Sequence, residues 1–264
     1  CAHEALVLIF TKLRGTSTPE SVFRPAALVP AFRCEAWVGD VVKGLLRHVP
    51  EVLVVDDGSE DGTSEAARAA FAREALDRLR VTPGTTSVGA ASGFPIGARA
   101  SFHVPARVEG SRTAAPDEAD SVACSVVTPE FVETLGVPLL RGRRLTGGDT
   151  AVSDRVALVN RQLANRYWPD GDPIGRTIDL DPGSGNQRRV TVVGVVGDFG
   201  RGFQGGTAEP QVFVPNDQQP MSRLVVVARV SGDAGRVAQA MRQTIRDLDR
   251  DVPVSDVMTA AEIR

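Results

Sequence analysis

The feature that most constrains the fold is a change in hydrophobic pattern part of the way along the chain. Up to about residue 80, short apolar runs alternate with helical patterns, which is typical of layered α/β arrangements. Beyond residue 85, strand patterns predominate, joined by Gly-, Pro- and Ser-rich loops, and helical patterns are only occasional. We therefore predict an α+β fold with mixed sheets and strand-helix-strand units, preceded by a partial Rossmann-like α/β segment.

The pattern also gives approximate bounds for the elements. Strands are predicted at 28–32, 51–55, 87–91, 101–108, 121–127, 155–159, 177–180, 189–196, 211–214, 224–230 and 252–257. Helices are predicted at 36–48, 63–80, 160–168 and 234–248, with a short one that Thr128 caps, Pro129 begins and Gly136 ends. Asn160 is expected to open the helix that follows it.

Composition excludes several functional classes. The 264 residues are 42% hydrophobic and 24% charged, as in ordinary globular proteins, and the net charge of -3 gives no basis for nucleic-acid binding. No apolar run reaches the length of roughly 18 residues that a bilayer span requires. The three cysteines fit no zinc spacing and no closed disulfide framework. The chain begins at Cys1 rather than Met, as a fragment would.

A turn rich in carboxylates, VDDGSEDGT at 55–63, is the strongest apparent site. Together with the residues before it, this turn resembles the opening of a family 2 glycosyltransferase over about 28–67. The residues that carry the resemblance are Val29-Pro30-Ala31-Phe32, Glu35, the helical pattern at 38–48 and the apolar run at 52–55. The resemblance implies nucleotide-sugar binding by Asp56 and Asp57. Downstream carboxylate pairs such as Asp170/Asp172 do not lie where that family would place a metal site, so we expect the segment to be inactive.

Other apparent motifs have simpler interpretations. The turn has early EF-hand spacing, but Arg68 stands where the closing Glu belongs. The G-x-G-x-x-G run at 200–205 precedes a strand pattern rather than a helix, so we interpret it as a loop. His103 and Cys124 are expected to be structural. The basic run at 141–144 is either a solvated loop or a contact for an anionic partner. We therefore predict no catalytic residues, no metal and no cofactor.

From about residue 67 to 264 the chain resembles the periplasmic core domain of MacB-type ABC-transporter permeases, the class that also carries FtsX-like membrane segments. The stretches that carry this resemblance lie in order along the chain: 71–80, Pro83-Gly84, Ser87-Val88, 127–131, 134–143, 156–160, 167–169, 172–175, 192–198, 247–249 and Pro253-Val254. The resemblance implies a domain that stands outside the membrane, catalyses nothing and passes movement from an ATPase to partners or substrate in the cell envelope.

The same resemblance implies partners and a domain division. Membrane segments of the permease, an ATPase subunit or domain, and an envelope adaptor are the expected partners, and a membrane helix would follow soon after Ile263. No G-x-x-x-x-G-K-[ST] phosphate loop occurs in the chain, in keeping with an ATPase located elsewhere. We expect a glycosyltransferase-like segment at 1–66 and the permease domain at 67–264.

Three hypotheses follow for the whole chain. The main one is an extracytoplasmic permease domain, and the alternative is an inactive glycosyltransferase fragment. The third is a misjoined chain with no settled function. Under the main hypothesis, we expect the apolar strand at 52–55 to complete the sheet of the permease domain by pairing with the strand at 87–91 or with later strands.

Overall fold

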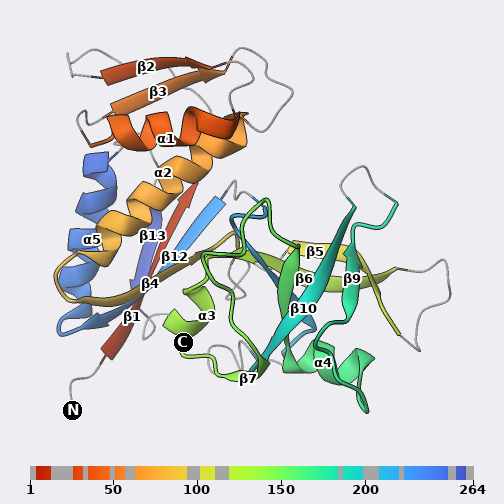
Figure 1. The fold of residues 1–264 in the computed structure, drawn as a ribbon. Coiled ribbons are helices and arrows are strands. Elements are labelled where there is room, and N and C mark those ends of the chain that lie inside the picture. Colours follow the sequence, from red (N-terminus) through yellow and green to blue (C-terminus); the bar gives the residue numbers. More distant parts are fainter. Residues whose placement is uncertain are drawn as a thin grey trace. The chain divides into compact units, whose positions relative to one another are not determined.

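The structure, a computed structural model, divides the chain into two compact units (Figure 1). It describes residues 4–12, 26–31, 35–47, 51–56, 63–93, 102–110, 119–183, 187–198, 208–219, 223–248 and 254–259. Unit 1 comprises Cys1–Ala90 and Pro220–Glu262, and unit 2 comprises Ala91–Gln219 with the last two residues. The chain thus leaves unit 1 within one strand and returns to it near residue 220.

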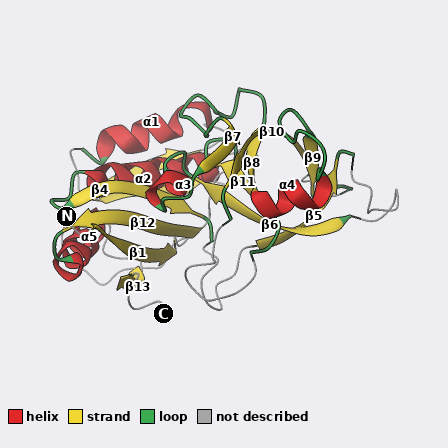
Figure 2. Cartoon of the chain, turned by 90° about the horizontal axis from the view of Figure 1, so that it is seen from below, coloured by secondary structure: helices red, strands yellow, loops and turns green. Residues whose placement is uncertain are grey.

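The main sheet of unit 1 is built from strands far apart in the sequence. Its order is β4 (Thr85–Ala91), β12 (Arg223–Ser231), β1 (Glu4–Lys12) and β13 (Val254–Thr259). β1 is antiparallel to both neighbours, and Figure 2 shows it between them. Its ladder with β12 is unbroken from Glu4 opposite Ser231 to Lys12 opposite Arg223. The first strand of the chain is therefore an inner strand of this sheet.

Two helices complete the frame of unit 1. α5 (Ala234–Leu248) contacts β1, β12 and β13, and it also packs against α2 (Thr63–Arg80). The buried residues of α5 recur at spacings of three or four, which places them on one face: Val237, Ala238, Met241, Ile245 and Leu248. The bounds of α5 are those predicted from the sequence, 234–248.

A separate strand-helix-strand element precedes α2. β2 (Ala26–Ala31) and β3 (Glu51–Asp56) form a two-stranded parallel sheet, with α1 (Glu35–Leu45) as the connection between them. Val38 and Val42 of α1, with Leu46 just after it, form a core cluster with Ala70 and Ala75 of α2. α1 therefore lies between the small sheet and α2 (Figure 1).

The expectation that 52–55 would complete the sheet containing β4 is wrong. In the described part of the chain β3 pairs with β2 alone, in a sheet of its own. Two physical reasons account for this. β1 supplies the strand beside β12 through a long antiparallel ladder, and β3 is paired with β2 along its whole length.

Unit 2 contains a closed ring of six paired strands. Its strands are β5 (Phe102–Val108), β6 (Asp120–Val127), β8 (Val156–Asn160), β9 (Thr177–Leu180), β10 (Arg188–Val196) and β11 (Gln211–Pro215). Their order is β11-β8-β10-β9-β5-β6, and a parallel pairing of β6 with β11 closes the ring. β7 (Leu139–Gly142) pairs with β10 outside this path. Closure leaves the six strands without a free edge in the ring.

The short helices of unit 2 confirm one predicted cap and correct another. α4 (Arg161–Tyr167) begins as predicted, because the side-chain oxygen of Asn160 accepts a hydrogen bond from the Leu163 N–H. α3 (Phe131–Thr134) does not begin at Thr128-Pro129 as predicted, since Glu130 is its N-cap and makes no side-chain cap bond. The Thr128 carbonyl instead accepts the Phe131 N–H in a turn, at 3.1 Å.

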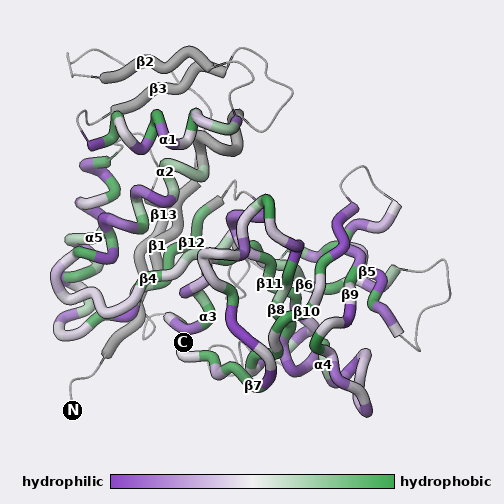
Figure 3. The backbone as a smooth tube through the Cα atoms, in the orientation of Figure 1, coloured by the Kyte–Doolittle hydropathy of each residue, from purple (hydrophilic) through white to green (hydrophobic). Residues whose placement is uncertain are grey.

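The core of unit 2 lies within the ring and beneath the helices. All five residues of β8 and all five of β11 are buried. Figure 3 shows hydrophobic colour concentrated along β6, β8, β10 and β11, and hydrophilic colour along much of α4. Phe213, Leu158, Leu163, Ile178 and Leu180 are among the largest fully buried side chains. Among the helices that the structure describes, none has the length and apolar character needed to cross a bilayer.

Candidate functional site

The carboxylate turn is only partly within the described residues. Asp56 is the last residue of β3, and Asp57 lies outside the described residues, as does most of the turn. The predicted loop at 200–205 also lies outside them. The nucleotide-sugar prediction for Asp56 and Asp57 therefore receives neither support nor contradiction from geometry.

The downstream carboxylate pairs that could have served a metal are occupied by structural contacts. Asp179 accepts two hydrogen bonds from Arg189, at 2.7 and 3.0 Å, and this guanidinium lowers the pKa of the Asp179 carboxyl. Asp181 pairs with Arg188 at 2.8 Å, and Asp172 accepts the Ile174 N–H. Across the described ranges, no group of three or more His, Cys, Asp or Glu side chains is arranged to hold a metal ion.

His103 and Cys124 have the structural surroundings that the sequence predicted for them. Cys124 is buried in β6, and burial raises the pKa of its thiol to about 11, so it is not a thiolate near neutral pH. His103 in β5 pairs with Glu209 at 2.9 Å, and both side chains are nearly half exposed. Neither residue has the partners of an activated nucleophile.

The basic run at 141–144 is divided by the structure. Arg143 makes a bidentate ion pair with the buried carboxylate of Asp149, at 2.7 and 2.9 Å, and the Thr146 N–H donates to the same carboxylate. These donors lower the pKa of Asp149. Arg141 belongs to β7 and makes no ion pair within the described part of the chain. The run is therefore neither a wholly solvated loop nor a single basic patch.

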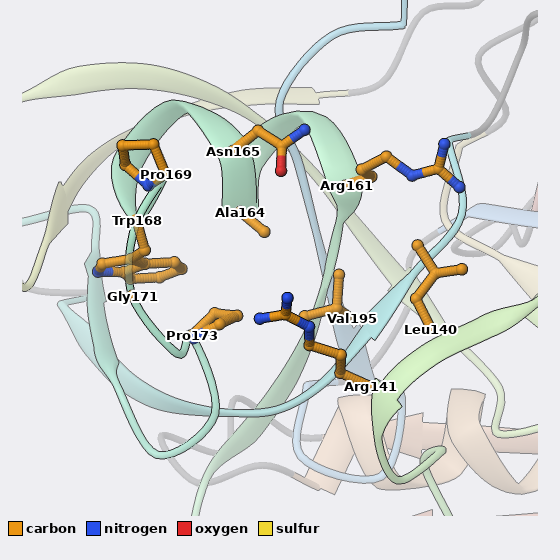
Figure 4. Close-up of a pocket in the computed structure, with 10 residues that line it drawn as sticks. All are labelled: Leu140, Arg141, Arg161, Ala164, Asn165, Trp168, Pro169, Gly171, Pro173 and Val195. Atoms are coloured by element: carbon orange, nitrogen blue, oxygen red, sulfur yellow. The ribbon is translucent and has the colours of Figure 1, made fainter.

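Arg141 lies instead in a pocket of about 230 Å³ between β7, β10 and α4 (Figure 4). Arg141 is directly opposite Val195 in the β7–β10 ladder, so both side chains stand on the same face and line the pocket. The next residue, Gly142, has a φ of +71°, and a Cβ there would collide with the Val193 carbonyl oxygen. The close approach of β7 to β10 at Gly142 thus fixes the position of Arg141.

The opposite wall is one face of α4 and its C-terminal extension. Arg161, Ala164, Asn165 and Trp168 recur at i, i+3, i+4 and i+7, the spacing of a single helical face. Pro169, Gly171 and Pro173 close the side near Trp168, and Leu140 lies on the β7 side. Among the described residues that line the pocket, none is Asp or Glu.

Trp168 is held in place from outside the pocket. Its indole Nε1–H donates to the Glu109 carbonyl oxygen at 2.7 Å. The Glu109 carboxylate accepts the Thr177 N–H and hydroxyl, both at 2.9 Å, and pairs with Arg176 at 3.1 Å. These bonds lower the pKa of Glu109. The turn after β5 therefore joins the start of β9 to the end of α4 and sets the position of the indole ring.

A buried amide network joins α4 to the ring of strands. Besides the cap, the Asn160 side-chain oxygen accepts the Gln211 N–H at 3.0 Å, and its amide donates to the Glu209 carbonyl at 2.8 Å. Gln211 in turn donates to Ser125 at 3.0 Å. The sequence identified Asn160 as a helix cap, but its bonds to β11 depend on a fold that brings residues about fifty positions apart together.

Chemically, the pocket combines hydrogen-bond donors with apolar surface. Within the described residues the pocket offers guanidinium and amide donors, with apolar walls, and it contains no side chain that is both nucleophilic and paired with a base. Sequence reasoning missed the pocket. The two parts of the sequence that form it are the basic run at 141–144 and the helical face at 161–168. They come together because β7 pairs with β10, and α4 also contacts β10.

Comparison with known proteins gives one family and several similar structures. The sequence model of the MacB-like periplasmic core domain matches residues 58–244. The fold is similar to the periplasmic region of MacB from Actinobacillus actinomycetemcomitans, with 15% identity, a TM-score of 0.52, and coverage of 72% of this chain and 78% of that one. The extracellular domain of the noncanonical ABC-type transporter YknZ from Gram-positive bacteria matches with 14% identity, a TM-score of 0.48, and coverage of 70% and 87%. A search of curated proteins gives no match.

The match over most of the chain defines the class: an extracytoplasmic domain of an ABC-transporter permease, periplasmic or extracellular in location. The chain belongs to the MacB-like periplasmic core domain family. Its mixed α+β fold agrees with that of the MacB structure. Neither the family match nor these structures support the glycosyltransferase resemblance of 28–67, and the match itself begins at residue 58, inside the carboxylate turn.

Proposed function

We propose that this domain transmits conformational change within an ABC transporter and catalyses no reaction itself. The observation that carries the proposal is the family match over 58–244. Two further observations support it. The chain crosses between the two compact units at about 90, 219 and 262, and the pocket described above has binding groups without catalytic ones among the described residues. A unit connected through few backbone crossings is suited to relative movement.

The partners that we propose are those of such a transporter. Membrane segments of the permease and an ATPase subunit or domain would lie on one side, and an envelope adaptor would contact the domain outside the membrane. We propose further that the segment at 1–66 carries no nucleotide-sugar site, and that β2, α1 and β3 form an addition packed on α2. The division at 66/67 remains a prediction.

The test measures movement between the units in the reconstituted parent transporter. Val81 in unit 1 is 79% exposed and Val152 in unit 2 is 96% exposed, so both accept a spin label after substitution by Cys. Cys1 and Cys34 are replaced by Ser, and the buried Cys124 is kept. We expect the distance distribution between the labels to change between the nucleotide-free and the ATP-trapped transporter.

The matched control is the same doubly labelled chain in isolation, where ATP should change nothing because no phosphate loop is present. Identical distributions in both states of the whole transporter would refute transmission through this domain. Metal-dependent hydrolysis of a uridine-nucleotide sugar by the chain, lost in Asp57→Ala, would refute the absence of catalysis.

A further inference from the structure

We propose that the pocket between β7, β10 and α4 binds the carboxylate of a Glu or Asp side chain presented by an acidic segment of a partner protein. The inference rests on the proposed function in one respect only, namely that a protein partner reaches this domain outside the membrane.

The pocket is a positively charged place on a chain of net charge -3. Figure 4 shows the Arg141 guanidinium in the middle of the pocket, near Pro173 and Trp168, while Arg161 stands at the rim and points outwards. Neither arginine has a carboxylate partner within the described residues, whereas Arg143, two positions after Arg141, is fully engaged by Asp149. The Arg141 guanidinium thus has no counter-ion among the described residues.

Several backbone N–H groups around the pocket that could bind an anion are already used. At the start of α4, the Gln162 N–H donates to Asp198 and the Leu163 N–H donates to Asn160. The Gly171 N–H donates to the Trp168 carbonyl oxygen. A phosphate group, which is bound best by several converging donors, would find a single guanidinium here. A carboxylate needs only that one planar fork, which can bind it bidentately.

The remaining walls suit the stem of such a side chain. Trp168 is 7% exposed and Val195 is 4% exposed, and with Leu140 and Pro173 they provide apolar surface around the guanidinium. A volume of about 230 Å³ is below the range of roughly 300–1,000 Å³ typical of sites for drug-sized molecules. It is suited to one anchoring side chain of a larger partner. The Asn165 side-chain amide at the rim can form a hydrogen bond with the backbone of the partner.

The experiment uses fluorescence of the pocket's own indole. The chain has two tryptophans, and Trp37 on α1 is 54% exposed, so Trp37→Phe in the full 264-residue chain leaves Trp168 as the only reporter. The probe is an acetylated, amidated hexapeptide of alternating Leu and Glu. We expect a saturable change in Trp168 emission that weakens as salt is raised. The same peptide with Gln in place of Glu should give none.

Three variants decide whether Arg141 is responsible. Arg141→Gln should weaken the Glu peptide at least about tenfold, because a charged hydrogen-bonded anchor is lost. Arg141→Lys should lie between, since it keeps the charge without the fork. Arg155→Gln removes an exposed arginine that does not line the pocket, and should leave binding unchanged. Thermal unfolding confirms that all three variants remain folded.

Several outcomes would overturn the proposal: no response to the Glu peptide, an equal response to the Gln peptide, or an equal loss in Arg155→Gln. Inorganic phosphate or phosphatidylglycerol vesicles that bind as tightly as the Glu peptide would assign the pocket to phosphate instead. Because this experiment needs only the isolated chain, its failure leaves the distance measurement in the whole transporter untouched, and the reverse also holds.

Discussion

The two units of this domain are built on opposite plans. Unit 2 is essentially one continuous stretch, 91–219, whose six ring strands close on themselves. Unit 1 takes its inner strand β1 from the start of the chain and β12 and β13 from its end. Unit 2 is thus continuous in sequence and its strands form a closed ring. Unit 1, which contains the first and the last described strands, depends on pairing between strands far apart in the sequence.

The largest expected effect comes from cutting the chain at the unit boundaries. A fragment of residues 91–219 should fold alone, because its ring, its core and its polar network are internal to it. A fragment of residues 1–90 should not, because β12 and β13 are missing from its sheet. Far-UV circular dichroism with thermal melting distinguishes a cooperative transition from its absence. A cooperative thermal transition of 1–90 alone would show that unit 1 does not need β12 and β13 to fold.

An intermediate effect is expected at the amide network of unit 2. Asn160→Ala removes the cap of α4 and leaves the buried Gln211 N–H without its acceptor, which should cost about 3 kcal/mol of unfolding free energy. Asn160→Asp keeps the accepting oxygen but loses the bond to the Glu209 carbonyl, and should cost less. Urea denaturation of the 91–219 fragment and of the whole chain gives both values. Equal losses for the two variants would mean that the accepting oxygen is unimportant.

The smallest expected effect is a pH dependence of unit 2 through Asp149. Its pKa in the folded chain lies below the ordinary value of 3.8, so its pairing stabilises the fold above that value, and the stabilisation is lost as the pH falls through the lowered pKa. Asp149→Asn should therefore cost about 1 kcal/mol at pH 7, since Arg143 is half exposed. The difference in unfolding free energy between the two proteins should narrow as the pH is lowered from 7 to below 3.8. A gap that is equally wide at both pH values would remove the ion pair as its cause.

The sequence predicted elements far better than their assembly. The helix at 234–248, the Asn160 cap and the strands at 177–180 and 189–196 follow from local signals, and the structure has all of them. The prediction for 52–55 is wrong because apolar content shows that a strand is buried but does not identify its neighbour. The Thr128 cap failed for a local reason, since the Thr128 carbonyl closes a turn before α3 begins.

The pocket shows why a binding site is harder to predict than a helix. Its α4 face follows from spacing alone, yet Arg141 and Val195 are brought together by a ladder between strands more than fifty residues apart. β7 itself was not predicted, because its four residues are mostly exposed and lack an apolar alternation. The family resemblance could identify the class of protein from ordered motifs, but it assigns no role to these side chains.

The antiparallel pairing of β1 with β13 has a mechanical consequence. Val7 is opposite Thr259 and Thr11 is opposite Val254, so the start of β1 lies beside the end of β13. A force that moves these two strand ends in the same direction displaces the pair as one body. It also acts on α5, which contacts both strands. A force that pulls the same ends apart breaks the hydrogen bonds of the ladder one after another. The β1–β13 pair is therefore stiff towards common motion of its two strands and weak towards their separation.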